Sequence, residues 1–182
     1  MNNYVPYHIH DQLSLLDSVT DFKEYVDKAV EYNMKAIACT NHGNVYKWIE
    51  RLLYCKEKGI KYIHGCEVYL TETLDEKIRD NYHTVLLAKN QEGLKELHTL
   101  LDLSTHPSHV YYKNRISFDE FLNISDNIIK TSACLASPLQ KLDEGNPYYD
   151  KLAKHYDFFE IQYHNCEEQK EFNRKLYKLS KK

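Results

Sequence analysis

The sequence predicts an α/β fold in which helices cover a mostly parallel β-sheet. Short apolar segments alternate along the chain with longer segments whose apolar residues recur every three or four positions, and this alternation is typical of a parallel sheet with helices outside it. Polar residues of the kinds found in metal sites stand at the ends of several apolar segments. With 182 residues, the chain is long enough to bury one core without disulfides or a structural metal.

The expected strands are short apolar or alternating runs bounded by glycine, asparagine or proline. They cover residues 4–10, 36–40, 60–70, 82–88, 127–131 and 158–164, with a break or bulge at Gly65. The pattern fits an open doubly wound sheet or a barrel, although six strands are too few for a complete eight-stranded barrel.

Helices are expected where apolar residues recur at helical spacing between capping signals. Asn33 and Gly59 are expected to end the first two helices, Asn90 to cap the third, and Ser117 with Glu120 to form a capping box. The expected helices cover residues 20–33, 45–58, 90–103 and 117–124, one or two helices within 137–156, and 167–181. Residues 71–81 are expected to form a charged loop or a short helix, residues 104–114 are expected to be irregular, and no linker or repeat divides the chain.

Composition narrows the class of protein. The five cysteines are an odd number without a Cys-x-x-Cys pair, which argues against a secreted disulfide framework and a zinc ribbon. No signal peptide and no apolar run of membrane-spanning length are found, so we expect a cytoplasmic protein with no membrane partner. The net charge of −3 does not indicate nucleic-acid binding.

Several catalytic signatures are absent from the sequence. There is no G-x-G-x-x-G run and no phosphate loop, which excludes the usual dinucleotide and P-loop nucleotide sites. No G-x-S-x-G nucleophile turn is present, and no Asp-x-Asp pair supplies the acids of a polymerase two-metal centre.

The pair His8 and His10 is the first candidate metal site. Residues two apart in a strand point to the same face, so the two imidazoles are expected side by side. The pair alone leaves metal binding and ordinary hydrogen bonding equally open. Further candidates stand at or just after the ends of later strands, namely His42, Glu67, Cys134 and His164, whereas His83 begins its strand. In parallel sheets these ends share one edge, and imidazole, carboxylate and thiolate are ligands for zinc, manganese or iron.

A set of motifs, in order along nearly the whole chain, resembles the PHP (polymerase and histidinol phosphatase) domain of bacterial DNA polymerase III alpha subunits. The motifs are Tyr7-His8-Ile9-His10, Ser14-Leu15-Leu16-Asp17, Thr40-Asn41-His42-Gly43-Asn44, Gly65-Cys66-Glu67-Val68-Tyr69, Tyr82-His83 with Leu86-Leu87-Ala88-Lys89-Asn90 and Glu92-Gly93, Tyr111-Tyr112-Lys113 with Arg115-Ile116, and Ser132-Ala133-Cys134-Leu135.

The resemblance implies a distorted seven-stranded β/α barrel, similar to a TIM barrel, with up to three zinc or manganese ions. It implies that the metal ligands are His8, His10, Asp17, His42, Glu67, His83 and Cys134, with Asn41 and His164 near the site. No catalytic residue distinct from the ligands is implied, because a metal-bound hydroxide attacks phosphorus in active members.

Two departures from the family pattern bear on activity. The family usually has Thr-Asp-His-Gly where this chain has Asn41, and its last strand carries an Asp-x-His pair that this sequence lacks. We therefore expect one PHP domain over residues 1–182, C-terminally incomplete, without the last barrel strand and with fewer than three metals.

The resemblance leaves several functional readings open. The leading expectation is phosphoester hydrolysis of the 3′→5′ exonuclease type, with DNA or another phosphoester as substrate and polymerase domains or replication subunits as partners. The chain would be a piece of a longer alpha subunit or a short relative from a split or phage-like gene. The alternatives are a non-catalytic structural or interaction module of the replication machinery and a stand-alone PHP phosphatase.

Overall fold

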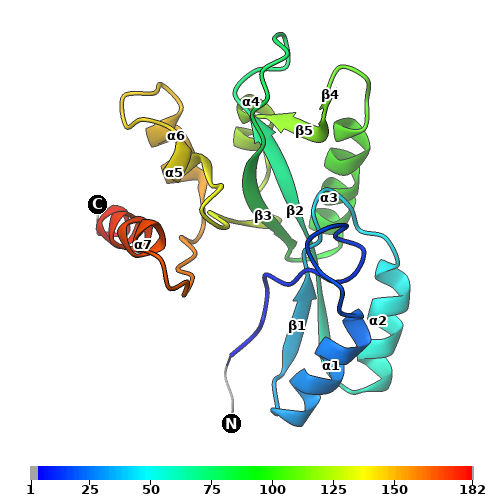
Figure 1. Cartoon of the computed structure of the whole chain (residues 1–182). Coiled ribbons are helices and arrows are strands. Elements are labelled where there is room, and N and C mark those ends of the chain that lie inside the picture. The colour runs from blue at the N-terminus through cyan, green and yellow to red at the C-terminus, as the bar shows by residue number, and fades with distance from the viewer. Residues whose placement is uncertain (1–3, 182) are drawn as a thin grey trace. The chain divides into compact units, whose positions relative to one another are not determined.

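The computed structural model describes residues 4–181, which divide at Glu67 into two compact units (Figure 1). Each unit combines helices with strands, so the mixed α/β prediction is confirmed. One strand, β2 (Lys61–Thr71), belongs to both units: residues 61–67 lie in the first and residues 68–71 in the second. In the described part of the chain, no helix has the length and apolar character needed to cross a membrane.

The first unit is a small layer of helices on a pair of parallel strands. Its elements are α1 (Phe22–Glu31), β1 (Ala36–Cys39), α2 (Trp48–Glu57) and the first residues of β2. The pairing places Ala36 opposite Lys61 and Cys39 opposite His64. The core of this unit consists of Phe22, Val26, Ala29, Ile37, Cys39, Cys55 and Ile60. Because this core joins α1, α2 and β1, it fixes the carboxyl end of β1, where the candidate site begins.

Local signals explain the ends of these helices. Asp21 caps α1, and its side chain and that of Glu24 form a reciprocal capping box. Asn33 follows the helix with φ 56°, and Gly59 follows α2 with φ 72°. Both residues adopt the left-handed conformation that ends helices, as predicted.

The first expected strand is not a regular strand. Residues 4–10 run beside β1, with Ala38 N donating to Pro6 O and Thr40 N to Ile9 O. The amide of Ile9, however, donates to the hydroxyl of Thr40 at 3.1 Å rather than to a backbone carbonyl. Because a side chain takes the place of a ladder partner, the segment is extended but irregular.

The second unit contains a sheet flanked by helices. Its elements are β3 (Tyr82–Ala88), α3 (Gln91–Ser104), β4 (Val110–Tyr111), β5 (Lys113–Ser117), α4 (Phe118–Leu122), β6 (Ile128–Thr131), α5 (Pro138–Lys141), α6 (Tyr149–His155) and α7 (Glu167–Leu179), with the last residues of β2. The strand order is β4-β5-β2-β3-β6. With β4 and β6 at its two ends, the sheet is open among the described residues.

Three details of the sequence prediction are wrong in this unit. The sheet is mixed, because β3 pairs with β6 and β4 pairs with β5 in antiparallel fashion. Residues 104–114 are not wholly irregular, since β4 and the start of β5 lie there. The expected strand 158–164 is reduced to a single bridge between Phe158 and Thr131. In that segment the Glu160 amide donates to the Ser132 hydroxyl at 2.9 Å, so a side chain again takes the place of a backbone partner. In the first unit, the expected break or bulge at Gly65 is absent as well, since β2 runs through it.

Candidate metal centre

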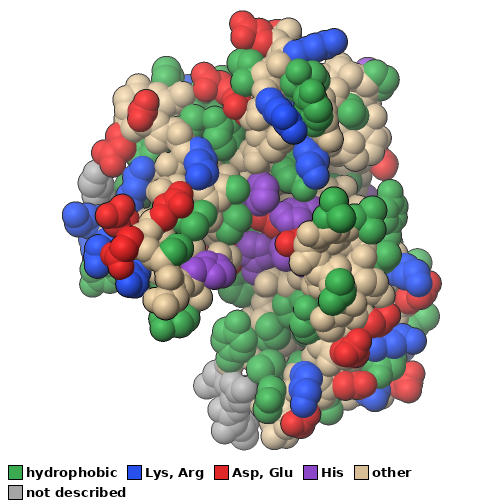
Figure 2. Space-filling model, viewed as in Figure 1, with side chains coloured by type: hydrophobic (Ala, Val, Ile, Leu, Met, Phe, Trp, Pro, Cys, Tyr) green, Lys and Arg blue, Asp and Glu red, His purple; other side chains and the backbone are tan. Residues whose placement is uncertain are grey.

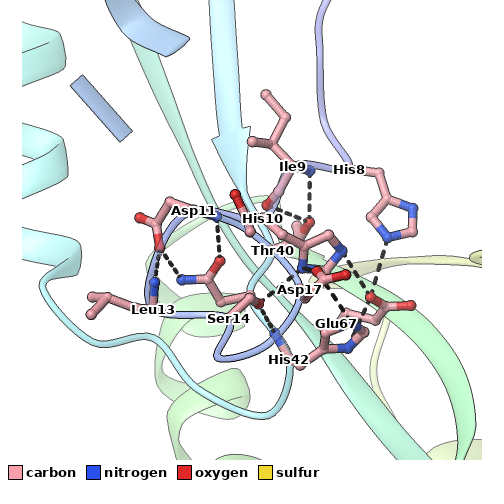
Figure 3. A network of polar contacts seen from close by, with 12 residues as sticks. His8, Ile9, His10, Asp11, Leu13, Ser14, Asp17, Thr40, His42 and Glu67 are labelled. Carbon is pink, nitrogen blue, oxygen red and sulfur yellow. Dashed lines mark hydrogen bonds and ion pairs between the residues drawn. The ribbon is translucent and has the colours of Figure 1, made fainter. Parts of the chain in front are cut away.

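Three imidazoles of the first unit converge on one carboxylate oxygen. Glu67 Oε2 lies 3.2 Å from His8 Nε2, 3.0 Å from His10 Nε2 and 3.1 Å from His42 Nδ1 (Figure 3). The Glu67 side chain is 1% exposed, so it approaches these rings from the interior. The four residues come from three segments: residues 8–10, the turn after β1, and β2.

Backbone contacts explain why the segments meet. The hydrogen bonds between Ile9 and Thr40 hold residues 8–10 beside the end of β1, with His8 and His10 both turned toward Glu67. An isolated parallel bridge joins His42 to Glu67, and Gly43 N donates to Glu67 O at 2.8 Å. Gly43 has φ 63°, a conformation that suits glycine and lets the chain turn directly after His42. The predicted same-face geometry of His8 and His10 therefore holds without a regular strand.

Asp17 forms a second group with two of these rings. Its Oδ2 lies 3.6 Å from His10 Nδ1 and 3.6 Å from His42 Nε2. The rings of His10 and His42 stack at a centroid distance of 4.4 Å and an interplanar angle of 18°. Each ring thus presents one nitrogen toward Glu67 and the other toward Asp17. Because the Asp17 side chain is 43% exposed, this group lies on the solvent side of the cluster.

The donor set fits a divalent metal. Two overlapping groups, His8 with His10 and Glu67, and His10 with Asp17 and His42, each hold their donor atoms within 4.8 Å of one another. Ligand atoms around a tetrahedral zinc ion lie about 3.4 Å apart, given metal–ligand distances of about 2.1 Å. The imidazole–carboxylate distances of 3.0–3.6 Å are of that size. Imidazole and carboxylate also suit zinc, manganese and iron.

The cluster is open to solvent on its histidine side. The His8, His10 and His42 side chains are 11%, 17% and 20% exposed. Histidine side chains are visible on the molecular surface in Figure 2. Ions and substrate can therefore reach the imidazoles, whereas Glu67 stays shielded.

A second layer of polar residues supports the rings. Ser14 Oγ accepts from the His42 amide at 3.0 Å and lies 3.1 Å from His10 Nδ1. Behind it, the buried carboxylate of Asp11 is bound by Asn41 and Arg51. These contacts fix the orientation of candidate ligands, a role that second-layer residues have in metal sites.

Two nearby thiols are not suited to bind metal. Burial raises the pKa of the Cys39 thiol to about 12, and burial likewise raises the pKa of Cys66 well above its ordinary value. Cys66 Sγ instead donates to the Asn41 carbonyl at 3.2 Å. Since metals bind thiolate, both cysteines remain neutral structural residues near pH 7.

In the second unit, His83 and Cys134 contact each other. His83 Nδ1 lies 3.5 Å from Cys134 Sγ, and the His83 amide donates to the Ala136 carbonyl at 2.9 Å. Tyr69 packs edge-on against the His83 ring, with centroids 5.2 Å apart. Of the other predicted residues, Asn41 is buried against Asp11, and exposed His164 lies 3.2 Å from Gln162 Oε1.

The sequence reasoning missed Ser14, Asp11 and Arg51 as supporting residues. Asp11 directly follows the His-x-His pair, and an acid in that place was a usable signal. Arg51 gave no such signal, because its burial against Asp11 depends on the packing of α2.

Comparison with known proteins identifies the family of this chain. A family model described as "PHP domain" matches residues 6–166. The DNA polymerase III subunit alpha of Chlamydia trachomatis serovar D is 34% identical, with 92% of this chain and 15% of that protein covered. The same subunit of Borreliella burgdorferi is 33% identical over 99% of this chain and 17% of its own length. The chain therefore spans about a sixth of the curated relatives it matches.

A solved structure supports the fold. The crystal structure of a candidate metal-dependent phosphoesterase from Bifidobacterium adolescentis superposes with a TM-score of 0.58, covering 97% of this chain and 82% of that protein. Sequence identity is 12%, so this likeness concerns the fold alone.

Proposed function

Because the chain belongs to the PHP domain family, we propose that it is a metal-dependent phosphoesterase domain of a DNA polymerase III alpha subunit-like replication protein. The observation that carries the proposal is the convergence of three imidazoles on the buried carboxylate of Glu67. The proposed reaction is hydrolysis of a phosphoester, of the 3′→5′ exonuclease type on DNA. The proposed overall fold is the distorted seven-stranded barrel that the family resemblance implies.

The proposed metals are zinc or manganese. Bound divalent ions supply Lewis-acid chemistry, which activates water and neutralises negative charge on the phosphate oxygens. The proposed ligands of the first unit are His8, His10, Asp17, His42 and Glu67. In the second unit, His83 and Cys134 are proposed as ligands, supported by their mutual contact and by the family pattern.

The proposed role of each residue follows from how deeply its side chain is buried. Glu67 lies under the imidazoles and provides a fixed negative charge that holds cations at the cluster. Asp17 lies on the exposed side, where it adds a negative charge facing solvent. Ser14 contacts the His10 ring and the His42 backbone amide, so it orients the first ring and holds the backbone that carries the second.

The partners are part of the same proposal. The relatives are DNA polymerase III alpha subunits, and we propose DNA as substrate and the other replication subunits as neighbours. The alternative hypothesis is a non-catalytic interaction module, and a hydrolysis assay distinguishes it from an enzyme.

The test is hydrolysis by the purified chain supplied with Mn²⁺ or Zn²⁺. Substrates are a 3′-labelled single-stranded DNA and a generic phosphomonoester, with His8→Ala/His10→Ala as the disabled variant and His106→Ala as a matched control. His106 is exposed, contacts Ser108 and is not a proposed ligand. We expect the double variant to lose metal and hydrolysis and the control to keep both. Hydrolysis that survives the double substitution contradicts the proposal that the metal centre is catalytic. Metal binding without hydrolysis supports the non-catalytic module.

A further inference from the structure

Asp11 is a buried carboxylate whose two oxygens are both bound. Oδ1 accepts from Asn41 Nδ2 at 2.6 Å and from the Leu13 amide at 2.9 Å, and Oδ2 accepts from Arg51 Nε at 2.9 Å and Nη2 at 2.5 Å. The residue is 1% exposed and Arg51 5%. A buried carboxylate is tolerated only when paired and hydrogen-bonded, and these contacts meet that condition.

Asp11 and Asn41 bind each other in both directions. The Asn41 amide donates to the Asp11 carboxylate, and the Asp11 backbone amide donates back to Asn41 Oδ1 at 2.9 Å. Asn41 is also 1% exposed, so neither bond competes with solvent. We call these two reciprocal hydrogen bonds the Asp11–Asn41 clasp.

The clasp stands next to two proposed ligands. Asp11 directly follows His10, and Asn41 directly precedes His42. It therefore joins the backbones that carry the two stacked rings, whose centroids are 4.4 Å apart. A shift of either backbone would move one ring relative to the other and to Glu67.

We propose that the Asp11–Asn41 clasp, with Arg51 as its counter-charge, is the positioning element that holds His10 and His42 in metal-binding geometry. This inference rests on the metal centre of the proposed function. Asp11 and Asn41 act through the neighbouring histidines and bind no metal themselves, because both side chains are turned toward each other and Arg51.

The clasp requires one acid and one amide. Asn41→Asp places a second carboxylate against Asp11 where the amide now donates at 2.6 Å, while the guanidinium of Arg51 is already paired with Asp11. Like charges at such a distance repel strongly in a buried site. Exchanging the two residues, Asp11→Asn with Asn41→Asp, restores one acid and one amide.

The experiment compares Asp11→Asn, Asn41→Asp, the exchanged double variant and the unchanged chain. Zn²⁺ affinity is measured by competition with a chromophoric chelator, and the visible spectrum of bound Co²⁺ reports ligand geometry. Val26→Ala is the control for lost stability, since Val26 is fully buried in the core of the first unit and is not a proposed ligand. Asn41→Ala serves as a second variant if Asn41→Asp does not fold.

The expected result has three parts. Asp11→Asn and Asn41→Asp, or Asn41→Ala in its place, weaken Zn²⁺ affinity by about 10–100-fold and alter the Co²⁺ spectrum, as losses of second-layer partners do. The exchanged double variant binds more tightly than Asn41→Asp alone, and Val26→Ala keeps the parent affinity and spectrum. Single variants that bind Zn²⁺ like the parent, or a Val26→Ala protein that loses as much Zn²⁺ affinity as they do, overturn the clasp. Failure of the unchanged chain to bind Zn²⁺ overturns the metal centre instead.

Discussion

His83 Nδ1 lies 3.5 Å from Cys134 Sγ, although 51 residues separate the two in the chain. The antiparallel pairing of β3 with β6 explains the contact. Val85 lies opposite Thr131, so the start of β3 meets the residues that follow the end of β6. Unlike the other candidate ligands, His83 lies at the start of its strand. Because β3 runs antiparallel to β6, this position lies beside Cys134.

The contact predicts a soft ligand in the second unit. Cys134→Ser replaces a thiol by a hydroxyl of similar shape, and we expect Zn²⁺ affinity to fall at least about 10-fold while Mn²⁺ affinity changes less, because thiolate prefers soft metals. Chelator competition with each metal measures the difference. Cys166→Ser, at an exposed cysteine, is the control and is expected to change neither affinity. Equal effects of Cys134→Ser on both metals would argue against thiolate ligation.

Asp17 offers a test of the second group of donors. Asp17→Asn removes a charge that lies 3.6 Å from both His10 and His42, so we expect fewer bound ions per chain while the Glu67 group stays occupied. Elemental analysis of the metal-loaded protein gives the ratio. Asp27→Asn removes a charge at a half-exposed aspartate paired with Lys58 and should leave the ratio unchanged. An unchanged number of bound ions per chain in Asp17→Asn would show that Asp17 is not a metal ligand.

Much of the fold could be predicted from local sequence signals. The caps at Asn90 and Ser117 and the terminators Asn33 and Gly59 depend on nearby backbone, and the helices follow them. Strand direction and pairing depend on contacts far along the chain, so the antiparallel pairs were missed. Residues 4–10 and 158–164 have strand-like sequences, yet hydroxyl groups of Thr40 and Ser132 take the ladder positions.

Gly93 in α3 tests a close packing contact of the second unit. A Cβ at this position would overlap the Asn127 carbonyl oxygen, which also accepts from the Lys89 amide. Gly93→Ala should therefore lower the free energy of unfolding by about 1–3 kcal/mol, as overpacking does. Urea unfolding measures the change. Gly145→Ala is the matched control, because nothing lies within 4 Å of a Cβ there. A Gly93→Ala protein as stable as the Gly145→Ala protein contradicts the packing.

The Glu120 capping box predicts a pH dependence of stability. Burial alone would raise the pKa of Glu120, but hydrogen bonds from His109 and Ser117 outweigh it and lower that pKa. A carboxyl with a lowered folded pKa stabilises the fold above its ordinary pKa, and this contribution disappears as the pH falls through the folded pKa.

We therefore expect Glu120→Gln to lower the free energy of unfolding at pH 7 by about 1 kcal/mol, the usual size for a cap. The difference from the parent should shrink toward about pH 3, below the ordinary glutamate pKa of about 4.3. Urea unfolding at several pH values follows it, with exposed Glu92→Gln as control. A difference that stays constant with pH would contradict the role of the ionised carboxylate.

Part of the candidate site could be predicted from residue types and their order rather than from local capping signals. The ligand types and their order in the chain predicted His8, His10, His42 and Glu67 as candidate ligands, and the structure brings these four side chains together. The amide at Asn41, a departure from the family pattern, is explained only by the structure, where it binds Asp11. That contact crosses from one segment to another and leaves no local signal.

The most direct test of the metal centre is the Zn²⁺ affinity of Glu67→Gln. Glu67 Oε2 lies within 3.2 Å of three imidazole nitrogens, and the glutamine keeps the shape but removes the charge. Glu31→Gln, at an exposed glutamate paired with Lys28, is the matched control. Chelator competition should show that the parent and Glu31→Gln bind Zn²⁺ alike and that Glu67→Gln binds at least about 10-fold more weakly. Equal Zn²⁺ affinity in all three proteins would contradict a metal centre built around Glu67.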